Sequence, residues 1–248
     1  MTISGCSLFP DKKSDDATEN WSAERLYYEA KDSMDSGYHV QAVEYYKKLQ
    51  ARHPFGKFSK QAQLDLAYSY YKQDETAASI AACNRFLKLY PTHPRADYAY
   101  YLKGLALFNQ GKGLVERYIP KDASQRDPGA ALGSFREFSD LVKRYPNSEY
   151  VPDARQRMLY LRNGLARHEV NVAEYYMRRN AFVAAANRAR YAVENFQQAP
   201  AIPDALTIMA KAYKVLGMTD LSDDALRVLE KNFPKHAGIA EVRETTVR

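Results

Sequence analysis

The feature that most constrains the fold of this chain is a phrase that recurs along it. An aromatic residue or His is followed by Pro, and Ala stands eight residues after that Pro. Self-similarity at a fixed spacing is the mark of a repeat architecture. The phrase occurs at His53-Pro54 with Ala62, Tyr90-Pro91 with Ala99, Tyr145-Pro146 with Ala154, Phe196-Gln197 with Ala205, where the Pro is lost, and closes at Phe233-Pro234.

Two further positions in each unit favour small residues. Units that begin two residues before the Ala start at Ala23, Lys60, Asp97, Pro152 and Pro203. Position eight is then Ala30, Ala67, Gly104, Leu159 and Ala210. Position twenty of a regular unit lies twelve residues before the closing Pro or its equivalent, and counting back from there gives Ala42, Ser79, Ser134, Ala185 and Ser222. Small residues let two antiparallel helices approach closely, and the closing Pro cannot continue the second helix. Each unit is therefore predicted to be a helical hairpin.

Small residues at positions eight and twenty and Pro at position thirty-two resemble the tetratricopeptide repeat, with about three residues added between units. One such repeat leaves its hydrophobic face uncovered, so stacking gives the array its core. We expect an all-α fold of five tetratricopeptide-like helical hairpins in a right-handed superhelix, followed by a C-terminal helix.

Two units are irregular. The third holds about 18 extra residues between its helices, at 109–128, and such loops often lie on a functional face. The fourth holds about 14 extra residues, and 152–178 is predicted to be one long helix. The resulting division is 1–20 as a tether, 21–128 as the N-terminal repeats with the long loop, and 129–248 as the C-terminal repeats and terminal helix.

The N-terminus resembles a bacterial lipobox. Ile3-Ser4-Gly5 precedes Cys6, the residue expected to carry a covalent lipid such as palmitate. A complete signal would have a charged region and 7–15 apolar residues upstream, so we expect the chain to begin inside the signal peptide or to have been trimmed. The polar segment up to Asn20 would span roughly 20 Å as a flexible tether. Ser7, in place of Asp, implies by resemblance an outer-membrane destination.

The sequence offers no catalytic chemistry. It contains no phosphate-binding loop, nucleophile elbow or zinc-protease motif, and its five His residues are scattered, so we expect no catalytic residue, no metal and no cofactor besides the lipid. The net charge is +6, and the Lys and Arg residues are interspersed with Asp and Glu along the chain. This pattern favours protein or membrane partners and no nucleic acid. Cys83 takes a packing position and is predicted to be buried.

The first helices of the second and third units suggest a groove for an extended peptide or a partner chain. Lys72 and Lys103 are expected to flank it. The alternative is that these aromatic residues pack against the next repeat. The candidate groove residues are Tyr68, Tyr71, Tyr101, Phe108, Gln61 and Phe55.

Several phrases between and within the repeats resemble one family, the BamD (ComL) lipoproteins of the β-barrel assembly machinery. They are His-Pro-Phe-Gly-Lys-Phe-Ser (53–59), Gln-Leu-Asp-Leu-Ala-Tyr (63–68), Pro-Thr-His-Pro (91–94), Arg-Asp-Pro (126–128), Arg-Tyr-Pro-Asn-Ser-Glu-Tyr (144–150) and Val-Ala-Glu-Tyr-Tyr (172–176). The resemblance implies a scaffold on the periplasmic face of the outer membrane, held by its lipid anchor alone. It further implies as partners the BamA periplasmic domain, BamC- and BamE-type lipoproteins and unfolded outer-membrane proteins.

Carried over by the resemblance, Val183, Asn187 and Arg188 match the docking helix for BamA, and Glu174 and Tyr175 belong to the last of the phrases above. Arg188 is the expected ion-pairing residue, since Arg suits a two-pronged carboxylate contact. An ordinary solvated Arg is the alternative. A periplasmic adaptor linked to cell-wall synthesis or division is the competing function, and a helical-repeat enzyme is a third, without a catalytic constellation.

Overall fold

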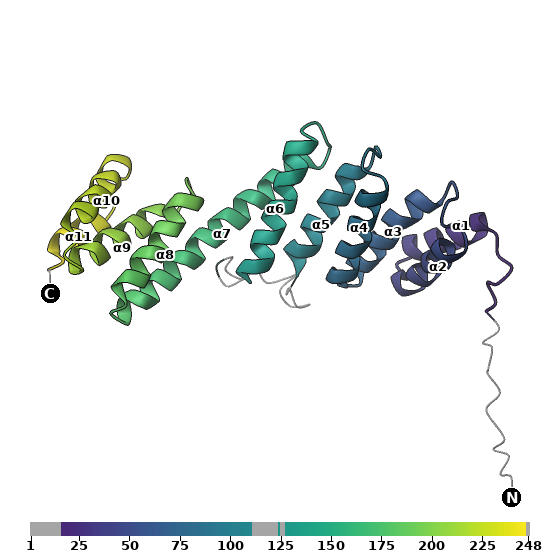
Figure 1. Cartoon of the computed structure of the whole chain (residues 1–248), viewed down its shortest axis with the longest axis horizontal. Coiled ribbons are helices and arrows are strands. Elements are labelled where there is room, and N and C mark those ends of the chain that lie inside the picture. The colour runs from purple at the N-terminus through teal and green to yellow at the C-terminus, as the bar shows by residue number, and fades with distance from the viewer. Residues whose placement is uncertain (1–15, 111–123, 125–126, 247–248) are drawn as a thin grey trace, which may run out of the picture.

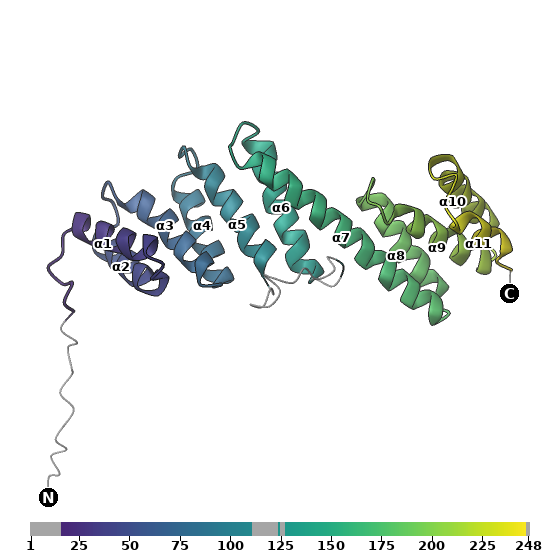
Figure 2. The same ribbon diagram turned by 180° about the vertical axis from the view of Figure 1, so that it is seen from behind.

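A computed structural model describes residues 16–110, 124 and 127–246, and these residues form eleven helices and no strand. Ten helices pair as five antiparallel hairpins along an elongated stack, with α1 and α11 at its opposite ends (Figure 1; Figure 2 from behind). The predicted all-α stack of five hairpins and a C-terminal helix is confirmed. The helices are α1 (Ala23–Asp35), α2 (His39–Arg52), α3 (Ser59–Lys72), α4 (Thr76–Leu89), α5 (Ala96–Asn109), α6 (Pro128–Arg144), α7 (Val151–Arg178), α8 (Phe182–Asn195), α9 (Ile202–Val215), α10 (Thr219–Asn232) and α11 (Gly238–Glu244).

The small residues meet inside each hairpin as the spacing predicts. In three hairpins a serine at position twenty donates a hydrogen bond to the backbone carbonyl at position eight. A side chain larger than serine would hold the two helices too far apart for this bond. The pairs are Ser79 with Ala67 at 2.9 Å, Ser134 with Gly104 at 2.9 Å, and Ser222 with Ala210 at 3.0 Å.

The long helix of the fourth repeat is confirmed, but the predicted register of its first half is wrong. Leu159, assigned to the small position, is 51% exposed. Ala173 is fully buried and stands twelve residues before Ala185, as in the regular hairpins. The extra residues therefore precede the small position. Fourteen residues are close to four helical turns, so both halves of α7 keep one buried face.

The turns inside the hairpins support the corrected register. Four of them contain a residue in the left-handed region, and each stands at position fifteen of its repeat when Ala173 is counted as position eight. Gly and Asn reach this conformation with little strain, and Asp tolerates it. The residues are Gly37 (φ 83°), Asp74 (φ 62°), Asn180 (φ 58°) and Gly217 (φ 73°).

The core runs along the stack as successive buried clusters. The largest joins α5 to α10 and includes Phe108 and Phe138 on either side of the long loop. Cys83 is fully buried in the second cluster, as predicted, and burial raises the pKa of its thiol to about 12. The protein has no described helix long and apolar enough to cross a membrane.

Two predicted features lie outside the described residues. They are the lipidation site Cys6, together with 1–15 of the predicted tether, and most of the predicted loop, 111–123 and 125–126. Ser124 is described and is buried against α7. Its carbonyl oxygen lies 3.0 Å from Nδ1 of His168, and its hydroxyl accepts a hydrogen bond from Asn171.

Candidate partner-binding surfaces

The first helices of repeats one to three form a cleft of about 580 Å³ at the N-terminal end of the stack. Its walls combine aromatic rings with charged side chains of both signs, which suits an extended peptide with a polar backbone and apolar side chains. The residues that carry this character are Tyr27, Lys31, Asp35, Gln61, Asp65, Tyr68, Arg95 and Tyr98.

The buried carboxylate of Asp65 is the polar anchor of this cleft. It accepts hydrogen bonds from the hydroxyls of Tyr27 at 3.3 Å and Tyr46 at 3.4 Å, and from the amide of Gln61 at 2.7 Å. Burial raises the pKa of the Asp65 carboxyl, and these donors oppose the rise. The network links the first two repeats and fixes the side chains that face the cleft.

The structure places two of the six groove candidates in this cleft, Gln61 and Tyr68. The hydroxyl of Tyr71 instead accepts a hydrogen bond from Asn109 on α5. The ring of Phe108 lies beneath the guanidinium of Arg157.

Tyr101 and Phe55 also lie outside the cleft. The Tyr101 hydroxyl donates to Asp153 at 2.7 Å and its ring stacks on Tyr150, so it packs against the next repeat. Phe55 is 97% exposed in the turn between α2 and α3. The prediction that Lys103 flanks the groove is wrong, because this side chain is buried and forms a 2.8 Å ion pair with Glu137.

On α8, the predicted ion-pairing residue Arg188 already has an internal partner. Its Nη1 lies 3.2 Å from Oε2 of Glu169 on α7. Glu169 is buried, whereas half of the Arg188 side chain is exposed, so further donors of the guanidinium face solvent. Val183 on the same helix is exposed, and the Asn187 side chain accepts a hydrogen bond from Arg190.

A second cleft, of about 490 Å³, separates α6 from α8. Tyr191 and Asn195 line it from α8 and stand three and seven residues after Arg188, which places all three on one face of that helix. Phe135 lines it from α6 and Arg162 from the inserted half of α7. Sequence reasoning missed this cleft because it arises where the four added turns of α7 separate the neighbouring second helices.

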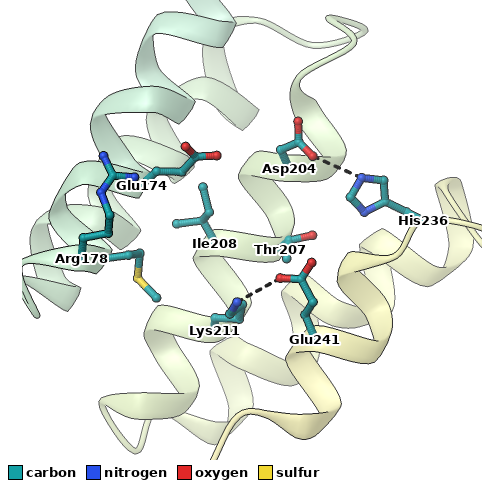
Figure 3. Close-up of a pocket in the computed structure, with 9 residues that line it drawn as sticks. Glu174, Arg178, Asp204, Thr207, Ile208, Lys211, His236 and Glu241 are labelled. Atoms are coloured by element: carbon teal, nitrogen blue, oxygen red, sulfur yellow. Dashed lines mark hydrogen bonds and ion pairs between the residues drawn. The ribbon is translucent and has the colours of Figure 1, made fainter.

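Glu174, predicted to dock with Arg188, lines a third pocket with residues of α9 and α11 and with none of α8 (Figure 3). Tyr175 is exposed beside it, with its ring edge-on to Tyr176. The predicted docking set is therefore divided between two surfaces. Glu174 falls on the face of α7 that carries this pocket only when Ala173, and not Leu159, is counted as the small position of the fourth repeat.

Within 16–110, 124 and 127–246 no group of three or more His, Cys, Asp or Glu side chains is arranged to hold an ion.

Comparisons with known proteins cover nearly the whole chain. A family model described as YfiO, outer membrane lipoprotein, matches residues 19–229. The protein named outer membrane protein assembly factor BamD from Neisseria meningitidis serogroup A is 44% identical over 88% of this chain and 82% of its own length. The proteins of the same name from Neisseria gonorrhoeae and Vibrio cholerae are 42% and 36% identical, over 95% and 92% of this chain and 88% and 92% of theirs.

Proposed function

The chain belongs to the YfiO family of outer membrane lipoproteins, which includes the BamD assembly factors, and we propose that it is a non-enzymatic scaffold for outer-membrane protein assembly. The observation that carries this proposal is the near full-length similarity to proteins named as outer membrane protein assembly factors. The fold supports it, because a stack of repeats offers several separate partner-binding surfaces.

Attachment to the outer membrane is assigned to a lipid on Cys6, with no other cofactor. The first described residues support a tether that leaves the fold at a defined point. Asp16 forms ion pairs with Lys48 at 2.6 Å and Arg52 at 2.5 Å, both on α2. Acyl chains upstream of this clamp would hold the N-terminal repeats close to the periplasmic face of the membrane.

The docking surface for the BamA periplasmic domain is assigned to α8 and the α6–α8 cleft. Glu169 fixes the position of Arg188 while donors of the guanidinium remain exposed to solvent. A carboxylate of the partner can therefore bind Arg188 without displacing Glu169. The cleft beside it offers the aromatic rings of Phe135 and Tyr191, the kind of side chain that dominates binding energy at interfaces.

The N-terminal cleft is assigned to an extended segment, either from an unfolded outer-membrane protein or from an accessory lipoprotein of the BamC or BamE type. Its aromatic and polar lining supports that role. The alternative function, an adaptor for cell-wall synthesis or division, is not favoured, because the relatives are named as assembly factors.

Recovery of BamA from detergent-solubilised outer membranes tests the scaffold and its docking surface separately. The wild-type chain is expected to recover BamA; without that recovery the scaffold proposal fails. Arg188→Gln should lower recovery at least about fivefold, since a charged interfacial contact is lost. The matched control is Arg85→Gln, which removes an exposed arginine of α4, outside the proposed docking surface. Equal recovery of BamA by the wild type and by Arg188→Gln would show that the docking surface lies elsewhere.

Charge reversal at Arg188 is the stronger but less selective variant. Arg188→Glu should also weaken recovery, but it places two carboxylates side by side at Glu169. Its thermal midpoint must therefore be measured with the binding. Anchoring is tested by fractionation: Cys6→Ser should move the protein from the outer-membrane fraction to the soluble periplasm, and unchanged membrane association contradicts the lipid assignment.

A further inference from the structure

The pocket between α7, α9 and α11 is a distinct site at the C-terminal end of the stack (Figure 3). Its volume is about 280 Å³. Met177 and Ile208 supply apolar walls, while Glu174, Lys211 and Glu241 bring charges to it. Helix α11 closes one side against α9, where the backbone of Gly238 contacts the side chain of Thr207 so closely that an added Cβ would overlap it.

This pocket is the repeat-equivalent of the N-terminal cleft. In the corrected register, both are lined by positions nine, twelve and thirteen of one repeat, by positions two, six and nine of the next, and by position two of the third. At the N-terminal end these are Lys31, Met34, Asp35, Gln61, Asp65, Tyr68 and Tyr98. At the C-terminal end they are Glu174, Met177, Arg178, Asp204, Ile208, Lys211 and Glu241. The same backbone geometry therefore builds a concave site twice.

Most charges of the C-terminal pocket already have partners. The carboxylate of Asp204 forms a 2.7 Å ion pair with Arg167, and its Oδ1 lies 3.2 Å from Nε2 of His236. Lys211 forms a 3.0 Å ion pair with Glu241. These contacts fix α9 to α7 and to α11, and they leave the pocket walls in place without a ligand.

Two charged residues of the pocket, Glu174 and Arg178, have no hydrogen-bond or ion-pair partner among the described residues. The carboxylate of Glu174 points into the pocket on the Ile208 side, whereas the guanidinium of Arg178, one turn later on α7, lies on the far side of Glu174 from Ile208 (Figure 3). Position nine, which is Lys31 in the N-terminal cleft, is thus acidic here. The unpaired charge on the Ile208 side of the pocket is therefore negative.

We propose that this pocket binds an extended segment of a partner protein and selects a Lys or Arg side chain, whose cationic group pairs with Glu174. Met177 and Ile208 would receive the aliphatic part of that side chain, which such residues bury while their charge stays at a polar partner. The proposal goes beyond the scaffold function and does not depend on BamA docking at Arg188, because no α8 residue lines the pocket.

Three fluorescein-labelled nonapeptides of the extended type, Gly-Ser-Val-Thr-Lys-Thr-Val-Ser-Gly and the same sequence with Gln or Glu at the centre, test the charge selection by fluorescence anisotropy on the full chain. The Lys peptide should bind about threefold to tenfold more tightly than the Gln peptide, and the Glu peptide most weakly. Glu174→Gln should abolish the preference, while Glu44→Gln, which changes an exposed glutamate of α2 outside the three clefts described above, should leave it intact.

Carbon-13 methyl spectra locate the site. Addition of the Lys peptide should shift the methyl resonances of Met177 and Ile208 at lower peptide concentrations in wild type than in Glu174→Gln. Gly238→Ala should push α11 away from α9 and weaken all three peptides together. Equal binding of the Lys and Gln peptides, or a Lys preference that survives Glu174→Gln, overturns the proposal. Unchanged thermal midpoints for the Glu174 and Glu44 variants establish that the effect is local.

Discussion

The hydroxyl of Ser134 donates a 2.9 Å hydrogen bond to the carbonyl oxygen of Gly104, although thirty residues separate them in the sequence. In the second and fifth repeats the equivalent partners are only twelve residues apart. The third hairpin therefore closes with the geometry of the regular ones, and its long insertion leaves the helix contact unchanged.

This hydrogen bond should contribute to stability as much as its counterparts do. Ser134→Ala removes the donor and is expected to lower the free energy of unfolding by about 1 kcal/mol. Ser222→Ala is the matched control in a hairpin with a short turn and should cost the same. Urea unfolding of both variants makes the comparison. A much smaller effect at Ser134 would mean that the third hairpin is held mainly by its apolar contacts.

Gly104 itself is required by the ring opposite it. A Cβ at this position would overlap the aromatic ring of Phe138. Gly104→Ala should therefore destabilise the protein by about 1–3 kcal/mol through overpacking, although Ala is the better helix former. Adding Phe138→Leu should recover part of that loss. Urea midpoints that show strictly additive costs would contradict a direct clash between the two side chains.

The thiol of Cys83 should report on opening of the second and third repeats. Burial raises its pKa to about 12, so at neutral pH the reactive thiolate is almost absent. In a Cys6→Ser background, iodoacetamide is expected to leave native protein unlabelled for hours and to label it rapidly in denaturing urea. Mass spectrometry gives the extent of reaction. Fast labelling of the native protein would show that this part of the stack opens readily.

The contact of Asp16 with α2 should depend on pH. Hydrogen bonds from Lys48 and Thr18 hold the pKa of the Asp16 carboxyl below its ordinary value of 3.8. Because the folded pKa is the lower one, the stabilisation is present above about pH 3.8 and is lost as the pH falls towards the folded pKa.

Trp21 makes this contact measurable, because it is the protein's single Trp and its amide donates to the carbonyl of Thr18. Its fluorescence should be constant above about pH 4 and change below it. Asp16→Asn should show the altered signal already at pH 7. If the Trp21 fluorescence instead stayed constant with pH in the wild type and was unchanged in Asp16→Asn, Asp16 would not hold the segment in place.

The regular part of the fold could be predicted because its determinants are local. A Pro that ends each second helix and two small residues that meet across each hairpin are visible in the sequence, and Ser79 and Ser222 lie where they were expected. The fourth repeat could not be placed in the same way. Fourteen added residues make nearly four whole turns, so the helical pattern continues without a break and Leu159 occupied the counted position in place of Ala173.

The surfaces were harder to predict, because they depend on contacts between repeats. Tyr68 is assigned to the N-terminal groove and lies there, whereas Tyr101 is assigned to the same groove but hydrogen-bonds to Asp153, 52 residues away. Nothing in the sequence indicates that Tyr101 and Asp153 are in contact. Likewise, the family resemblance assigns both Glu174 and Arg188 to docking, yet they lie on different surfaces, on α7 and α8.

The ion pair between Glu169 and Arg188 should couple stability to docking. Glu169 is buried and Arg188 is half exposed, so removing the arginine leaves a buried carboxylate without its partner. Arg188→Gln is expected to cost about 1–2 kcal/mol, less than for a fully buried pair because solvent reaches the guanidinium. Glu169→Gln should cost less, since the remaining guanidinium is solvated and the amide oxygen can still accept from it.

A double-mutant cycle separates this internal pair from partner binding. The double variant Glu169→Gln with Arg188→Gln should be more stable than Arg188→Gln alone, with a coupling energy of about 1 kcal/mol in urea unfolding. In the BamA recovery assay the double variant should remain as defective as Arg188→Gln, because the docking charge is still missing. If binding returned together with stability, Arg188 would act by supporting α8 and not by contacting the partner.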